Sequence, residues 1–434
     1  MGSPLRRALP AIALLALAVR VAYVLLDHGF PVAGDALSFH LEGGFLADGE
    51  GFRRAFEDVP TAEYPPLHTV VIAFTNLIGL HGTQGQKLFF ACVGTVTVVL
   101  IALLARAVTR SERVGVIAGV LAALYPMLWL PDGALMAETT YGVFVTGTLL
   151  AAVAMIRRPA VGRAVALGVL GGLAALTRGE GLGLVALLGI AIAWRAPGPW
   201  RRRAALLAVS GLACVVVLAP WTIRNLSTFA KPVPISANAN EIWVGANCPD
   251  VYYGDLIGAW KFQCYGKAPP GDESERAAAY RQRGIDYLRD HAGRLPVVVA
   301  ARLGRVLDVY EPWGTGTFLA SAEGRHPRAQ HLGLLAYWLL VPFAIVGVVL
   351  LRRRREPALL VLLVPIALAL LVAAVTYGST RFRFVAEPGL VVLGAVTVDV
   401  LLGALRARRR PASATATSDS AGISQSQSME AWKA

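Results

Sequence analysis

Apolar residues form long runs along this chain, and short polar or basic stretches separate the runs. A bilayer-spanning helix needs about 20 mostly apolar residues, and runs of roughly this length dominate the sequence. One further run, residues 70–80, is short and follows two prolines. We expect the segment 65–80 to re-enter the membrane or to lie at its surface. We predict roughly ten full spans, at residues 8–26, 87–105, 114–130, 136–156, 164–176, 182–194, 204–221, 332–351, 358–375 and 385–405.

Composition supports a membrane protein. The 434 residues are 56% hydrophobic and only 16% charged, and the mean hydropathy is +0.56. A soluble globule of this composition could not bury its apolar side chains, so we predict an all-α polytopic membrane protein. The net charge of +13 does not indicate a nucleic-acid partner, because most arginines stand in short clusters between the apolar runs.

The basic clusters predict how the chain is threaded through the membrane. Cytoplasmic connections carry the excess of Lys and Arg. If the segment 65–80 does not cross, every cluster and both termini fall on the cytoplasmic side; if it crosses, every cluster falls outside. We predict the first arrangement, a multi-pass protein of the cell (plasma) membrane that contacts membrane lipids. The clusters lie at residues 106–113, 157–163, 195–203, 352–355 and 406–410.

This threading divides the chain into four predicted regions. Residues 1–221 form an N-terminal transmembrane module with an outer loop at 27–68, and residues 332–405 form the C-terminal spans. Between them, 222–331 form an extracytoplasmic loop with interfacial helices, and 406–434 form a disordered cytoplasmic tail.

The loop at 222–331 is the largest extramembrane segment. Its first half is rich in Asn, Pro and Gly and is expected to be loop with room for a short strand, whereas residues 272–294 and 295–310 show helical patterns. Cys248 and Cys264 lie on the predicted oxidising side, where a disulfide between them is plausible but left open by the sequence. Their spacing is not that of a metal site.

Charged residues at the outer membrane edge are the candidates for a site. Asp35 lies at the centre of the acidic loop 27–68. Four arginines are exceptions to the positive-inside pattern because they fall on the outer side. Each of them alone could extend to lipid headgroups, but four arginines together with several carboxylates favour a shared anionic ligand. They are Arg178, Arg224, Arg381 and Arg383.

Several short motifs occur in order over nearly the whole chain. They include Gly34-Asp35-Ala36, Tyr64-Pro65-Pro66-Leu67, Ala137-Glu138-Thr139, Thr177-Arg178-Gly179-Glu180, Pro220-Trp221-Thr222-Ile223-Arg224-Asn225, Tyr287-Leu288-Arg289-Asp290-His291 and Arg381-Phe382-Arg383-Phe384. Together they resemble the polyprenyl-phosphate-dependent glycosyltransferases of the GT-C superfamily, in the branch of the protein O-mannosyltransferases and the lipid A aminoarabinose transferase. In that family an acidic residue often follows the loop aspartate. Here Ala36 takes that place, which leaves Asp35 as the only carboxylate of the pair.

The resemblance implies a GT-C-like helical bundle and a reaction. Such enzymes move a sugar from a polyprenyl-phosphate donor to an acceptor outside the cytoplasm, with inversion at the sugar. The acceptor could be a protein, a glycan or a lipid. No cofactor is expected. A divalent metal is possible but not supported, because the second acid of the family pair is missing and no His, Cys and Asp cluster has the spacing of a zinc site.

The resemblance also suggests roles for individual residues. Asp35 is the expected catalytic base, since a carboxylate in reach of the acceptor hydroxyl can take its proton. The four arginines Arg178, Arg224, Arg381 and Arg383 are expected to hold the donor phosphate, because guanidinium groups bind phosphate in a bidentate manner. The expected orienting or sugar-binding residues are Glu63, His68, Glu138, Glu180 and Asn225, although Glu180 could simply close a turn and His68 could be a packing residue.

Two other classes of protein remain as alternatives. A transporter or flippase for a lipid-linked or anionic substrate would also contain charged membrane segments and broken spans. However, such a carrier places its charges near the midplane, and no internal repeat relates the two halves of this chain. A catalytically inactive GT-C scaffold would keep the same arginines.

Overall fold

The computed structural model describes residues 4–26 and 32–408 of the protein. The described residues form helices and turns without a β-strand, which confirms the all-α fold predicted from the sequence. The first three residues of the basic lead, the start of the predicted loop 27–68 and the predicted disordered tail beyond Arg408 lie outside the described residues.

Six segments are long and apolar enough to cross a membrane. They are α1 (Pro4–Leu26), α4 (Thr83–Thr109), α7 (Ala137–Arg157), α10 (Trp200–Thr228), α16 (Pro327–Arg353) and residues 380–407, which comprise the 3₁₀ helix η5 (Thr380–Ala386) and α18 (Glu387–Arg408). Four shorter apolar helices accompany them: α3 (Leu67–Leu77), α8 (Val161–Thr177), α9 (Gly181–Arg195) and α17 (Leu359–Val375). The number of complete spans stays a prediction. With 11 residues, α3 is too short to cross the roughly 30 Å hydrocarbon core.

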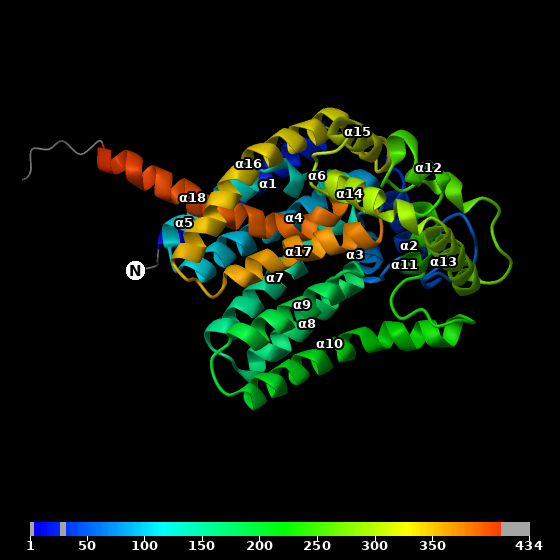
Figure 1. Ribbon diagram of the computed structural model, residues 1–434, viewed down its shortest axis with the longest axis horizontal. Helices are drawn as coiled ribbons and strands as arrows, with labels where there is room; N and C mark the ends of the chain where they lie inside the picture. The colour runs from blue at the N-terminus through cyan, green and yellow to red at the C-terminus, as the bar shows by residue number, and fades with distance from the viewer. Residues whose placement is uncertain (1–3, 27–31, 409–434) are drawn as a thin grey trace, which may run out of the picture.

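The long helices pack into one bundle whose core lies between α4, α7 and α18 (Figure 1). Helices α8, α9 and α10 lie along one side, and α8 packs against α10 at two glycines. A Cβ atom on Gly168 would lie 2.1 Å from the carbonyl oxygen of Ser210, and one on Gly172 would lie 2.9 Å from the Cβ of Val217. Small residues of this kind let membrane helices approach closely enough for dispersion contacts to hold them together.

The predicted span 114–130 is broken in the structure. Helix α5 (Glu112–Leu124) ends before Tyr125, and the short helices η1 (Pro126–Leu128) and α6 (Leu130–Gly133) follow. The cause is Pro126, because the residue before a proline is pushed out of the helical region, and Tyr125 has an extended ψ of 113°.

The break turns Asp132 toward the first helix. Its carboxylate lies 2.8 Å from Nε of Arg20 in α1, and both side chains are completely buried. Gly94 of α4 makes room for this pair, since a Cβ there would lie 2.3 Å from the Asp132 carboxylate. Arg20 therefore points into the bundle, where its charge is neutralised by a carboxylate.

Residues 229–326, between α10 and α16, fold into a helical cap at one end of the bundle, next to α2 (Asp35–Ala47). Figure 1 shows the start of α10 and the end of α18, both basic, at the opposite end. The helices of the cap are α11 (Asn238–Ala246), α12 (Pro249–Tyr252), η2 (Gly254–Leu256), η3 (Phe262–Tyr265), α13 (Glu273–Asp290), η4 (Ala292–Arg294), α14 (Leu295–Val306) and α15 (Pro312–Ala322).

Part of the cap differs from the sequence-based expectation. Residues 238–246 were expected to be loop or strand but form α11, whose Val244 packs against Tyr265 and Tyr280. Gly284 of α13 allows this close approach, because a Cβ there would lie 2.3 Å from the carbonyl oxygen of Trp243. Tertiary packing thus overrides the weak helix propensity of this Asn- and Gly-rich stretch. Cys248 and Cys264, whose pairing the sequence left open, form a disulfide in the cap.

Candidate functional site

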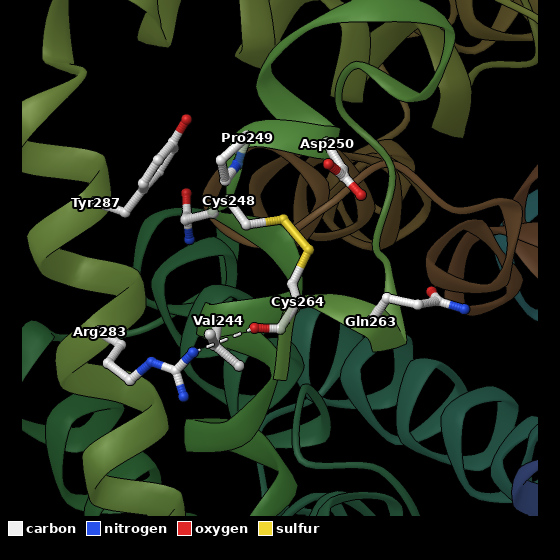
Figure 2. Close-up of a pocket in the computed structure, with 9 residues that line it drawn as sticks. Val244, Cys248, Pro249, Asp250, Gln263, Cys264, Arg283 and Tyr287 are labelled. Carbon is white, nitrogen blue, oxygen red and sulfur yellow. Dashed lines mark hydrogen bonds between the residues drawn. A yellow bond between two sulfur atoms is a disulfide. The ribbon is translucent and has the colours of Figure 1, made fainter. Parts of the chain in front are cut away.

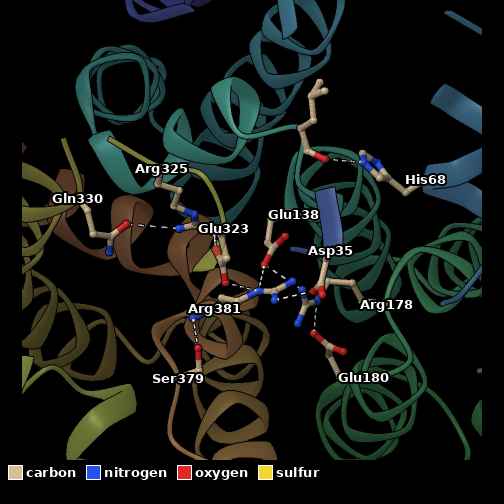
Figure 3. Close-up of polar contacts among 11 residues, drawn as sticks. Asp35, His68, Glu138, Arg178, Glu180, Glu323, Arg325, Gln330, Ser379 and Arg381 are labelled. Atoms are coloured by element: carbon tan, nitrogen blue, oxygen red, sulfur yellow. Dashed lines mark hydrogen bonds and ion pairs between the residues drawn. The ribbon is translucent and has the colours of Figure 1, made fainter. Parts of the chain in front are cut away.

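An ionic cluster lies where the cap meets the bundle (Figure 3). The start of α2, the start of α7, the turn between α8 and α9, the turn between α15 and α16, and η5 all contribute side chains to it. These segments are far apart in the sequence. The cluster consists of Asp35, Glu138, Arg178, Glu180, Glu323, Arg325 and Arg381.

Asp35 is the most accessible carboxylate of the cluster. It is the first residue of α2, its side chain is 31% exposed, and the side chain of Glu138 is 1% exposed. One carboxylate oxygen lies 2.8 Å from Nη1 of Arg381, and the other accepts a hydrogen bond of 3.0 Å from the Tyr64 hydroxyl. Two donors therefore fix the orientation of a carboxylate that remains open to solvent.

Arg381 and Arg178 share the carboxylate of Glu138. Its Oε1 atom lies 2.8 Å from Nε of Arg381 and 2.9 Å from Nη1 of Arg178. Arg178 also reaches Glu180, with 2.6 Å between Nε and Oε1. Glu138 and Glu180, two of the expected orienting or sugar-binding residues, therefore both pair with arginines in the structure. The adjacent carboxylates raise the pKa of Arg178, outweighing the effect of burial, so the group stays charged.

Sequence reasoning missed Glu323 and Arg325. Oε1 of Glu323 lies 3.1 Å from Nε of Arg381, and its Oε2 lies 2.7 Å from Nη2 of Arg325. An acid and an arginine two residues apart at the outer edge of a predicted span also occur at Arg178 and Glu180. The same pattern immediately before the run 332–351 could have indicated this pair.

The structure does not bring Arg224 and Asn225 to the cluster. Arg224 donates a hydrogen bond of 2.8 Å to the carbonyl oxygen of Thr61 and lies 5.0 Å from the ring centre of Trp221. The buried amide of Asn225 donates to the carbonyl oxygen of Val233. These contacts fasten the end of α10 to the first loop and to the start of the cap.

Arg383 is also held elsewhere, although it is only two residues from Arg381. It is buried between Asp308, at 2.6 Å, and Glu387, at 2.8 Å, and its guanidinium lies 3.4 Å from the ring centre of Tyr337. Both nearby carboxylates already neutralise its charge. The geometry therefore indicates that Arg383 anchors η5, from which Arg381 reaches the cluster.

His68 and Glu63 lie near the cluster but are not part of it. The imidazole of His68 is completely buried, with one nitrogen 3.0 Å from the carbonyl oxygen of Leu135 and the other 2.9 Å from the Thr140 hydroxyl. Both nitrogens are thus engaged in packing α3 against α7. Glu63 pairs with Arg54 at 3.3 Å.

Glu63 belongs to a second group of carboxylates, beneath the cap. Burial raises the pKa of Glu42 to about 9, and the pKa values of Glu63 and Glu241 each rise to about 7 for the same reason. Arg54 lies among them and lowers the pKa of Glu63 in part. Near neutral pH at least Glu42 therefore carries a proton in the folded protein.

Glu42 should make the folded protein less stable as the pH rises. A carboxyl with a raised pKa favours the folded state at low pH, and this contribution is lost from about the unfolded pKa upward. We expect the melting temperature to fall between pH 6 and pH 9. Glu42→Gln should flatten this slope and stabilise the protein at pH 9 by several kcal/mol, since each unit of pKa difference is worth about 1.4 kcal/mol. Thermal unfolding in detergent against pH measures both effects. Glu50→Gln, an exposed carboxylate just beyond the same helix, should keep the slope of the parent, and an unchanged slope in Glu42→Gln would contradict the assignment.

A separate cavity of about 330 Å³ lies in the cap beside the disulfide (Figure 2). Its polar lining comes from Asn247, Asp250, Gln263, Arg283 and Tyr287. None of the site residues predicted from the sequence lines it. Among residues 4–26 and 32–408, no three His, Cys, Asp or Glu side chains are grouped so as to hold a metal ion.

The described part of the chain is thus a helical bundle with several helices long and apolar enough to cross a membrane, a cap, and an ionic cluster at their junction. The oligosaccharyltransferase of Archaeoglobus fulgidus, solved without ligand, matches with a TM-score of 0.54 at 15% identity, over 92% of this chain and 51% of that one. This chain spans about half the length of that protein. The likeness confirms the GT-C-like bundle predicted from the sequence.

ArnT from Cupriavidus metallidurans, bound to undecaprenyl phosphate, is similar at a TM-score of 0.41 and 17% identity, over 89% of this chain and 77% of that one. Its apo form matches at a TM-score of 0.41 and 16% identity. No protein-family model and no curated protein sequence matches the chain.

Proposed function

We propose that this protein is an integral membrane glycosyltransferase that moves a sugar from a polyprenyl-phosphate donor to an extracytoplasmic acceptor with inversion. The observation that carries the proposal is the arrangement around Arg381. An accessible carboxylate, Asp35, lies 2.8 Å from a guanidinium, and a second guanidinium, that of Arg178, is joined to the first through Glu138. A base and a cationic phosphate site are the two parts that this transfer needs.

The proposed reaction is a single displacement. Asp35 takes the proton of an acceptor hydroxyl while the acceptor oxygen bonds to the anomeric carbon of the donor sugar. The bond from this carbon to the phosphate oxygen breaks on the opposite face, which inverts the configuration. Arg381 and Arg178 stabilise the negative charge on the departing polyprenyl phosphate. Arg224 and Arg383 are assigned no part in this step, because other groups already hold them.

The position of the cluster supports the extracytoplasmic side. It lies beneath the cap, whereas the basic start of α10 and end of α18 lie at the opposite end of the bundle (Figure 1). The excess of Lys and Arg marks the cytoplasmic side of membrane proteins. A cluster at one end of the bundle also suits a transferase better than a carrier, whose charges sit near the midplane. The polyprenyl-phosphate donor is inferred from the sequence motifs.

Sugar transfer by membranes tests this proposal. Membranes that contain the protein, and matched membranes without it, are incubated with a set of radiolabelled polyprenyl-phosphate sugars. We expect label to move from one donor class to a protein, glycan or lipid acceptor, with a single inverted anomeric linkage. Folded protein that transfers from no donor but moves a lipid-linked or anionic substrate across vesicles would establish the carrier instead. A retained anomeric configuration would exclude the single displacement.

A further inference from the structure

Arg381 is enclosed by carboxylates in the structure. Asp35 and Glu138 each lie 2.8 Å from its nitrogen atoms, and Glu323 lies 3.1 Å away (Figure 3). Nε of Arg381 donates to Glu138, Nη1 donates to Asp35, and Glu323 faces Nε as an ion pair. A phosphate that approaches this guanidinium therefore meets three carboxylates around it, and the withdrawal of one of them favours close binding.

The charges of the cluster give the same result. It contains four carboxylates, Asp35, Glu138, Glu180 and Glu323, but only three guanidinium groups. A phosphate that entered this arrangement unchanged would add negative charge to a site that already carries an excess. Repulsion between like charges in a partly buried site opposes such binding.

Glu323 is the carboxylate best placed to leave. Glu138 is fixed in the first turn of α7 and shared by two arginines, and Asp35 is fixed at the start of α2 by Arg381 and Tyr64. Glu323 instead stands in the four-residue turn 323–326 between α15 and α16, outside any helix.

This turn lies directly over the start of α2. The carbonyl oxygen of Ala322 lies so close to Gly34 that a Cβ at residue 34 would be 2.4 Å from it. Gly324 has a left-handed φ of 63°, which allows the chain to turn back sharply at this point. The turn therefore covers the residue next to the proposed base, and Glu323 reaches from it to Arg381.

We propose that Glu323 occupies the place of the donor phosphate on Arg381 and must be displaced when a lipid-linked phosphate binds. The inference rests on the proposed function and adds a competing residue to the same site. Displacement removes one negative charge from the cluster. It also separates Arg325 from its 2.7 Å partner, so that this guanidinium becomes available to the incoming phosphate. Glu323 thereby lowers the affinity for the donor phosphate until it is displaced.

Phosphate binding to the purified full-length protein in nanodiscs tests the inference. The probes are a polyprenyl phosphate, inorganic phosphate and the uncharged polyprenol. Glu323→Gln keeps the size of the side chain but removes its charge, and we expect it to bind polyprenyl phosphate about tenfold more tightly than the parent. Polyprenol binding should not change. A gain with inorganic phosphate as well would show that the freed arginines accept phosphate from either source, whereas a gain confined to the lipid would show that the prenyl chain is needed.

The control for this experiment is Glu311→Gln, an exposed carboxylate just before α15, which should bind like the parent. If Glu323→Gln does not fold, Glu323→Asp draws the carboxylate back by one methylene and should give a smaller gain. Equal or weaker binding in the folded variant would overturn the competition by Glu323. If Glu323→Gln shows no gain, Arg381→Ala separates the two proposals. Weaker polyprenyl-phosphate binding in Arg381→Ala than in the parent would keep the phosphate site and reject only the competing role of Glu323. Unchanged binding in Arg381→Ala would reject the phosphate site itself.

Discussion

Asp35→Asn is expected to lower the rate of sugar transfer by roughly 10²–10⁴-fold, the usual contribution of a general base. Asparagine has almost the same shape and can still accept the hydrogen bond from the Tyr64 hydroxyl, which lies 3.0 Å from Asp35. It cannot take a proton from the acceptor. Transfer of radiolabelled sugar measures the rate, and binding of the polyprenyl-phosphate donor is measured beside it.

Donor binding should survive in Asp35→Asn, because Arg381 and Arg178 remain. The matched control is Asp48→Asn, which changes an exposed carboxylate just after the same helix and should transfer at the parent rate. Transfer by Asp35→Asn at more than a tenth of the parent rate would rule out Asp35 as the base. Loss of transfer together with loss of donor binding would instead assign Asp35 to holding the site together.

Arg20→Met is expected to destabilise the bundle by about 3–5 kcal/mol, the usual cost of removing one partner from a buried ion pair. The Asp132 carboxylate lies 2.8 Å from Arg20 with both side chains completely buried. Without the guanidinium it would keep only the 2.7 Å hydrogen bond from the Thr139 hydroxyl. A charge left in this position has neither water nor a counter-ion. Thermal or denaturant unfolding in detergent measures the loss.

The double variant Arg20→Met with Asp132→Asn distinguishes the cause. Asparagine keeps a partner for Thr139 but carries no charge, so much of the stability should return. A double variant as unstable as Arg20→Met alone would mean that lost packing of the arginine side chain, not the unpaired charge, accounts for the effect. Arg113→Met, which changes an arginine that is 52% exposed and paired with Asp399, should cost less than about 1 kcal/mol.

The sequence predicts the fold class well because a bilayer imposes long apolar runs. The ends of the predicted spans lie within about five residues of the ends of the observed helices for α4, α7 and α16. Local pattern does not show the break at Tyr125, since one proline in an apolar run is compatible with a kinked helix as well as with a break. The helix α11 depends on packing against α13, which is distant in sequence.

The candidate site is predicted only in part, for a related reason. Arg381 and Arg383 look equivalent in the motif, yet Arg383 is buried with Asp308 and Glu387, whereas Arg381 reaches the cluster that contains the accessible Asp35. Which arginine remains for a ligand depends on contacts between distant segments. Glu323 reaches the cluster in the same way, through a turn that the sequence marks only by an acid and an arginine before a span.

Gly34 takes no part in the proposed chemistry, yet its surroundings restrict it severely. It has a φ of 56°, and any side chain would collide with the carbonyl oxygen of Ala322. Among homologues, natural variation should therefore spare this glycine as strictly as the aspartate that follows it. A profile built from such homologues would score the two positions alike, although one is constrained by its reaction and the other by the space that the backbone leaves.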